Sequence, residues 1–129
     1  MLVYKIVDLY YGAYTSYARW AMPAGIWVRY ELHQVARPIL AGSKLFAFDS
    51  KQHAAKFARS DGGSAMLECE CEGAKPYNGP LASPFSPEIW VDGEIAVPSG
   101  WDTHIVPEGT VLVDWLRPLK LLRRDDVGI

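Results

Sequence analysis

The densest group of reactive side chains near predicted turns lies in the run WDTHIVPE, between Trp101 and Glu108. A histidine oriented by a carboxylate can act as a general base, so His104 beside Asp102 is one candidate pair. The indole of Trp101 can stack on a base or a sugar. Asp and His in a segment rich in Pro and Gly are also common turn formers. Trp101, Asp102 and His104 are therefore candidate binding residues, with a plain turn as the alternative.

The two cysteines of the chain occur together, in the stretch LECECE at positions 67–72. Side chains alternate between the two faces of a strand, so Leu67, Cys69 and Cys71 share one face and the three glutamates share the other. A structural zinc site needs four ligands, and only the three histidines of the chain are left to complete one. We expect buried, reduced thiols without a metal, a cofactor or a disulfide, facing away from solvated carboxylates.

A second candidate binding surface is a row of residues in the alternating segment 26–33. Trp27, Arg29, Glu31 and His33 alternate there with apolar residues and are predicted to point outward from a strand. An exposed Trp and Arg are typical of protein-binding surfaces. The alternative is that a helix or a loop covers this row.

Other classes of function have weaker support in the sequence. The chain has no Walker loop, no dinucleotide fingerprint, no serine-hydrolase elbow, no zinc-protease helix and no EF-hand loop, so we expect a binding protein rather than an enzyme. The net charge of −2 creates no general field for nucleic acid. Tyr10, Tyr14, Tyr17 and Trp20 could stack on bases, but Arg19 is the one basic residue among them, and phosphate binding needs many cations. Protein partners are favoured over nucleic acid.

The compartment is suggested by the amino-terminal sequence and by hydropathy. The run MLVYKIVDLYY contains Lys5 and Asp8 and has no cleavage pattern of small residues, which argues against a secretory signal. No run approaches the roughly 20 apolar residues that a membrane span needs. We expect a cytoplasmic protein without membrane contact, and the sequence predicts no oligomeric state.

Period-two patterns dominate the chain and predict mostly strands. Residues 2–10 are apolar on both faces apart from Lys5 and Asp8, which predicts a strand in the middle of a sheet. Further strands are predicted over 13–21, 26–33, 44–48 and 110–116, and residues 119–126 are expected to form a final turn or a short edge strand. Asp92-Gly93 suits a type I′ turn that pairs Trp90 with Ile95.

One helix of about ten residues is predicted after residue 50. Asp49 or Ser50 can cap it, and Ala54 and Phe57 lie on the stripe that would pack on the sheet. His53 falls on the polar side and is interpreted as a solvated histidine. Two long segments, 73–88 and 98–109, are rich in Pro and Gly and are predicted to be irregular loops that carry function.

These elements predict one domain over residues 1–129. Its fold class is α+β, with a mainly antiparallel twisted sheet or partly open barrel of six to eight short strands and one short packed helix.

Four stretches carry a resemblance of layout: YKIVD at the start, KLFAFDSKQHAAKFA in the middle, MLECECEG after it and PEGTVLVDWLRPLKLL near the end. Their order resembles small uncharacterised proteins encoded by tailed phages and prophages. The resemblance covers most of the chain and implies a viral accessory protein acting in the host cytoplasm. We therefore expect binding of a host or viral protein through an exposed sheet face, such as the row at Trp27 and Arg29, or through the proline-rich loop 73–88. The alternative is a small enzyme or ligand-binding protein with a pocket near residues 101–108.

Overall fold

The computed structural model describes residues 1–10, 12–16, 28–39, 42–57, 64–81, 90–97, 99–100 and 104–122. Twelve strands and one helix occur in these ranges. The strands are β1 (Leu2–Tyr10), β2 (Ala13–Ser16), β3 (Arg29–Tyr30), β4 (Leu45–Phe48), β5 (Ser64–Glu70), β6 (Lys75–Pro76), β7 (Pro80–Leu81), β8 (Trp90–Val91), β9 (Glu94–Ile95), β10 (His104–Ile105), β11 (Thr110–Val113) and β12 (Arg117–Leu122); the helix is α1 (Lys51–Phe57).

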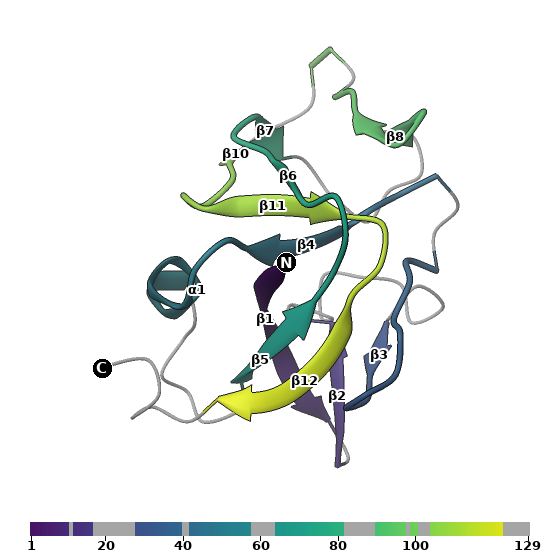
Figure 1. Ribbon diagram of the computed structural model, residues 1–129. Coiled ribbons are helices and arrows are strands. Elements are labelled where there is room, and N and C mark those ends of the chain that lie inside the picture. The colour runs from purple at the N-terminus through teal and green to yellow at the C-terminus, as the bar shows by residue number, and fades with distance from the viewer. Residues whose placement is uncertain are drawn as a thin grey trace.

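Eight of these strands form one antiparallel sheet, in the order β12-β5-β1-β4-β11-β6, with β2 paired to both β1 and β3 (Figure 1). The order does not close on itself among the described strands, so the open sheet is observed and a closed barrel is not. The prediction of a mainly antiparallel sheet with one short helix is confirmed. None of the described helical residues forms a segment long and apolar enough to cross a membrane.

Strand β1 occupies the middle of the sheet, as its two apolar faces predict. One edge pairs with β5 from Leu2 to Asp8, and the other is shared between β4 and β2. The side chains of Val3 and Val7 pack in one buried cluster, and those of Tyr4 and Ile6 pack in another. We call the first the cysteine face and the second the helix face. Both faces of β1 are therefore covered.

The alternation in LECECE is confirmed on the cysteine face. Leu67, Cys69 and Cys71 are buried in the same cluster as Val3 and Val7, and both thiols are free. The other side of β5 is not uniformly wet, because Met66 is buried on the helix face. The expectation of three fully solvated glutamates is also wrong for Glu70, which is ion-paired with Arg117. The antiparallel register explains this pair, since it places the two residues opposite each other.

Helix α1 begins where the sequence predicts a cap. The backbone N–H of His53 donates to Oγ of Ser50 at 3.1 Å, so Ser50 caps the first turn. Ala54 is fully buried on the helix face. The stripe predicts Phe57 in the core, but its side chain is 37% exposed and packs on the ring of Phe48, with ring centroids 5.3 Å apart. The described helix ends at Phe57, and Ala58 lies outside the described residues.

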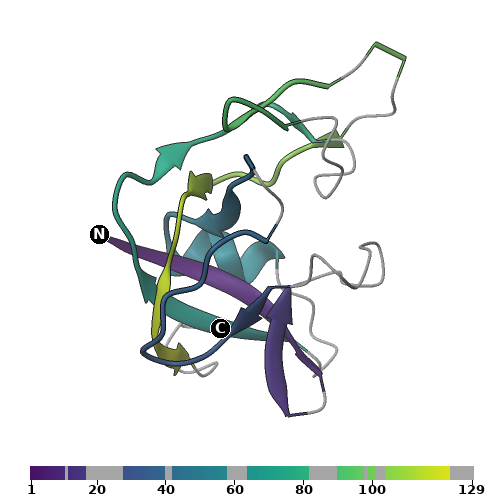
Figure 2. The same ribbon diagram turned by 90° about the vertical axis from the view of Figure 1, so that its right-hand side faces the viewer.

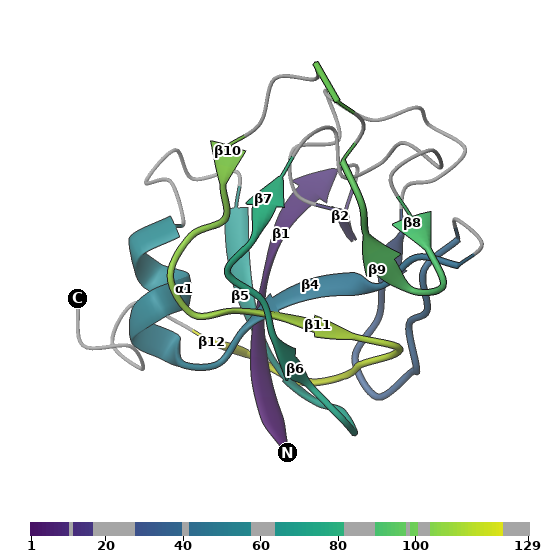
Figure 3. The same cartoon turned by 90° about the horizontal axis from the view of Figure 1, so that it is seen from above.

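The hairpin around Asp92 and Gly93 forms as predicted. Their φ angles of 51° and 77° are both positive, as a type I′ turn requires, and Trp90 pairs with Ile95. Trp90 packs with Phe46 of β4 and Leu112 of β11 in a third cluster. Seen from above, this hairpin and α1 lie on opposite sides of the molecule (Figure 3).

The two segments predicted to be irregular are partly regular. Within 73–88, residues 75–76 pair with β11 as β6, and residues 80–81 pair with His104–Ile105 as the ribbon β7–β10. The prediction failed because prolines argue against strands, whereas here Pro76 and Pro80 occupy edges where a missing N–H is tolerated. Tyr77 is ordered as expected and packs on the third cluster. The pairing of β7 with β10 brings the two segments together.

The predicted third strand is shorter than its alternation suggests. Val28 and Tyr30 are buried and Arg29 is exposed, as expected, but Leu32 is exposed instead of buried. A turn begins at Glu31, whose carbonyl accepts from the N–H of Gln34 at 3.2 Å. The alternation of a strand does not continue through such a turn, so Leu32 leaves the core.

The last two predicted strands also form. β11 ends at Val113, three residues before the predicted boundary, and β12 is the edge strand that the charged carboxyl-terminal run allows. Pro118 is fully buried within β12, next to an irregularity in the register between Pro118 and Lys120. A proline is tolerated at such a position because the ladder is already interrupted.

Candidate functional site

Several of the predicted binding residues lie outside the part of the chain that the structure describes. Trp101, Asp102 and Trp27 lie outside the described residues. His104 pairs with Leu81 in the β7–β10 ribbon, and nothing is described of its side chain. Arg29 is described, exposed and on β3. Among the predicted binding residues, Arg29 is therefore the one whose side chain the structure describes.

The chain that follows β3 forms an ordered surface segment, residues 31–39, which we call the crossing segment. It runs beside the start of β12 (Figure 2). Its backbone is fixed there by the N–H of His33, which donates to the carbonyl of Pro118 at 2.7 Å, and by Ala36, which exchanges two hydrogen bonds with Leu116 at 2.7 and 3.1 Å. Ala36 is buried in the cysteine-face cluster. These contacts hold the segment against the sheet without regular secondary structure.

The crossing segment exposes an unusual density of aliphatic side chains. Leu32 is 40% exposed, Val35 50% and Ile39 56%. Only ten large hydrophobic side chains are exposed among the described residues, so three in one short segment is a concentration. Single exposed apolar residues need no explanation, but a concentration of them on a fixed backbone is typical of an interaction surface. The alternation over residues 26–33 predicts Leu32 in the core, so Leu32, Val35 and Ile39 are not among the predicted binding residues.

Charged side chains flank these aliphatic residues. Nε of Arg29 lies 3.3 Å from Oε1 of Glu31, and both side chains are exposed. Arg37 is exposed and has no ion-pair partner among the residues that the structure describes. The outward row expected at Arg29, Glu31 and His33 is thus exposed in the described part.

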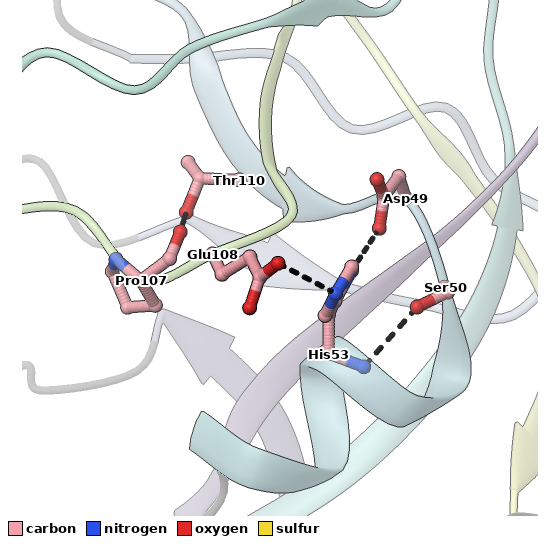
Figure 4. Close-up of polar contacts among 6 residues, drawn as sticks. All are labelled: Asp49, Ser50, His53, Pro107, Glu108 and Thr110. Atoms are coloured by element: carbon pink, nitrogen blue, oxygen red, sulfur yellow. Dashed lines mark hydrogen bonds and ion pairs between the residues drawn. The ribbon is translucent and has the colours of Figure 1, made fainter.

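A second polar site lies where α1 meets the turn before β11 (Figure 4). Nδ1 of His53 is 2.6 Å from Oδ1 of Asp49, one helical turn earlier, and Nε2 is 3.8 Å from Oε1 of Glu108. The His53 side chain is 27% exposed and is bonded to Asp49, so it is partly buried rather than freely solvated. A side chain at Gly109 would overlap this ring, which shows how closely the turn packs on it. The four-residue spacing of Asp49 and His53 on a predicted helix could have indicated their contact. It gives no indication of Glu108.

The surroundings of His53 are tightly bonded. The N–H of Asp49 donates to the carbonyl of Gly109 at 2.9 Å, and Oγ1 of Thr110 donates to the carbonyl of Pro107 at 2.6 Å. Because an ionised carboxylate only accepts hydrogen bonds, Nδ1 of His53 is the donor to Asp49. In the neutral ring the basic nitrogen is then Nε2, on the side of Glu108. The arrangement is suited to proton transfer, and equally to holding the turn on the helix.

One further polar group lies inside the cysteine face. Nζ of Lys5 donates to the carbonyl of Phe46 at 2.6 Å and lies 5.6 Å from the centre of the Tyr30 ring. Burial lowers the pKa of Lys5 from 10.5 to about 8, and the nearby Cys69 sulfur partly offsets this shift. Burial also raises the pKa of Cys69 to about 12, so this thiol is protonated and unreactive. The amine is a packed structural group, bonded within the sheet.

In the described residues, no three His, Cys, Asp or Glu side chains are arranged to hold a metal ion. Asp49, His53 and Glu108 are thus linked by one hydrogen bond and one longer ion pair.

Comparison of the chain with protein-family models, with curated proteins and with solved structures finds no match. Arguments about function thus rest on the residues themselves.

Proposed function

We propose that this protein binds another protein through the crossing segment. The observation that carries the proposal is the exposure of Leu32, Val35 and Ile39 on a backbone hydrogen-bonded to residues 116–118. Burying exposed aliphatic surface stabilises a complex by roughly 25 cal/mol per Å². A segment already fixed in the free protein loses little conformational entropy when it binds, so more of this gain remains as affinity.

The proposal includes a viral setting. The order of YKIVD, KLFAFDSKQHAAKFA, MLECECEG and PEGTVLVDWLRPLKLL supports a phage-type accessory protein that meets a host or viral protein in the host cytoplasm. This setting rests on the resemblance of layout alone. It predicts that the partner is present in bacterial cells or among the virus's own proteins.

The test is affinity capture from bacterial lysate with matched surface variants. Val35→Asp places a charge in the crossing segment, and Val91→Asp places one on the β8–β9 hairpin at a site of similar exposure, 53% against 50%. We expect wild type and Val91→Asp to recover the same protein, and Val35→Asp to recover at least tenfold less, as loss of an interface anchor does. Equal recovery by both variants would refute binding through this segment.

A second candidate function is a small-molecule or proton-transfer site around His53, close to the pocket expected near residues 101–108. The observation that favours it is the imidazole held between Asp49 and Glu108, with Nε2 as its basic nitrogen. General-base assistance of this kind contributes typically 10²–10⁴-fold to a rate.

This candidate is tested by hydrolysis of an activated ester such as 4-nitrophenyl acetate. His33 is an exposed histidine on the crossing segment, so His33→Gln is the matched control for His53→Gln. A catalytic His53 requires wild-type hydrolysis above background that falls at least tenfold in His53→Gln alone. Identical rates in the wild type and both variants leave His53 with a structural role.

A further inference from the structure

Residues 28–39, which add Val28, Arg29 and Tyr30 to the crossing segment, differ in charge from the protein as a whole. The chain carries a formal net charge of −2, whereas residues 28–39, VRYELHQVARPI, hold two arginines and one carboxylate. That carboxylate, Glu31, is already engaged by Arg29. Arg37 lies between Val35 and Ile39 in sequence and keeps its charge unpaired among the described residues.

The adjoining strand adds to this local positive charge. His33 is bonded to Pro118 of β12, and Lys120 follows two residues later, exposed and without an ion-pair partner in the described ranges. On β5, the half-buried Glu68 lies opposite Lys120 in the register, and Glu70 is engaged by Arg117. Within residues 28–39, the charged side chain without an ion-pair partner among the described residues is therefore the cation of Arg37.

We infer that the partner of the crossing segment presents an acidic, aliphatic-rich segment. This inference rests on the proposed function and adds the chemistry of its partner. Aliphatic side chains of the partner would cover Leu32, Val35 and Ile39, while its carboxylates would meet Arg37 and Lys120. Charge complementarity of this kind sets the choice of partner and the association rate more than the total affinity.

The probe is a pair of synthetic peptides with the same leucine positions, one with glutamates and one with lysines at the polar positions. Each is titrated into ¹⁵N-labelled full-length protein, and amide shifts are followed by NMR. We expect the acidic peptide to shift the amides of Leu32, Val35 and Arg37 and to bind at least tenfold more tightly than the basic peptide. The preference should shrink as salt is raised from 0.05 to about 0.5 M, because exposed charges are screened.

Charge reversal gives a matched pair of variants. Arg37→Glu removes the unpaired cation of the crossing segment, and Lys56→Glu makes the same change on the exposed side of α1. We expect Arg37→Glu to weaken binding of the acidic peptide about tenfold and Lys56→Glu to leave it unchanged. Far-UV circular dichroism of both variants verifies that they are folded.

Three outcomes distinguish this inference from the proposed function. Equal binding of the two peptides, or equal effects of the two charge reversals, would overturn the acidic partner. Shifts confined to residues away from 31–39 would overturn it as well. If Val35→Asp still abolishes capture from lysate in those cases, the proposed function stands and only the partner's chemistry is wrong.

Discussion

The two faces of β1 are both buried, but they accommodate polar atoms in opposite ways. The cysteine face encloses the amine of Lys5, which is satisfied by a backbone carbonyl and lies near the Tyr30 ring. The helix face encloses no lysine among its described residues and leaves its carboxylates at the margin, where Glu68 and Glu70 are half-buried. Burial is the main cause that raises the pKa of Tyr4 there. The negative charge of Glu68 and its hydrogen bond with the Tyr4 hydroxyl raise this pKa further.

This difference shows how one strand can be central and still carry a charge. A lysine inside an apolar cluster is tolerated when one strong acceptor is within reach, because the rest of its side chain packs as a hydrocarbon. Carboxylates at the margin need no buried donor, because water can reach them, and Glu70 also has Arg117 as an ion-pair partner. The two faces should therefore respond differently to pH and to substitution.

The largest expected effect is a dependence of stability on pH that comes from Lys5. Its pKa is 10.5 in the unfolded chain and about 8 in the folded protein, so the unfolded chain binds more protons between these values. The free energy of unfolding of the wild type should therefore rise relative to Lys5→Met by roughly 3 kcal/mol from pH 7 to 10.5. Urea unfolding of both proteins at several pH values measures the difference.

The comparison with Lys5→Met is needed because Cys69 acts in the opposite direction. Its raised folded pKa removes stability as pH rises above 9, the ordinary pKa of a thiol. Parallel pH curves for the wild type and Lys5→Met would show that the amine is solvated and that the two faces do not differ.

The next effect concerns close packing on the helix face. Ala54 is fully buried between α1 and the sheet, so Ala54→Leu should lower the free energy of unfolding by about 1–3 kcal/mol through overpacking. Gln52 lies on the same helix and is exposed, so Gln52→Leu should change it by less than about 0.5 kcal/mol. Similar losses in both variants would mean that α1 is not docked as described.

A smaller loss is expected on the cysteine face. Cys69→Ala removes one buried sulfur and should cost about 1 kcal/mol through a small cavity. The same burial protects the thiols, so a thiol reagent such as Ellman's reagent should label neither cysteine of the folded protein at pH 8 and both after unfolding. Rapid labelling of native protein would contradict the burial of this face.

The smallest expected effect is a difference in stability between variants of Glu70 and Glu72. Glu70→Gln breaks the ion pair with Arg117, a partly exposed pair, and should lower the free energy of unfolding by up to about 1 kcal/mol. Glu72 is exposed and has no ion-pair partner among the described residues, so Glu72→Gln should change it by less than about 0.5 kcal/mol. Equal changes would show that Glu70 is as solvated as Glu72.

The features that sequence predicts well here are local. The type I′ turn at Asp92-Gly93 depends on two residues that accept positive φ, and the burial of Cys69 depends on alternation within one strand. The central position of β1 follows from its apolar character on both faces. Each of these depends on a few adjacent residues, so no distant contact is needed to predict it.

The features that sequence missed depend on distant contacts. The sequence does not predict the contact between His53 and Glu108, because Glu108 comes from another part of the chain. The alternation of Leu32 with its neighbours predicts a core position, because it does not reveal the turn at Glu31. The pairing of β7 with β10 joins segments whose prolines favour loops. The pattern of apolar residues along a segment does not show which distant part of the chain that segment will contact.

The central place of β1 also has a consequence for synthesis of the chain. This strand leaves the ribosome before β4 and β5, which pair with it in the folded sheet. Strands β11 and β12 follow only after residue 109. A nascent chain that ends before Ser64 therefore displays an apolar strand with β2 as its main partner. Unpaired apolar edges are the surfaces that chaperones bind and that aggregate in their absence. Slow translation of residues 17–63 should increase the need for a chaperone, whereas slow translation after β5 should not.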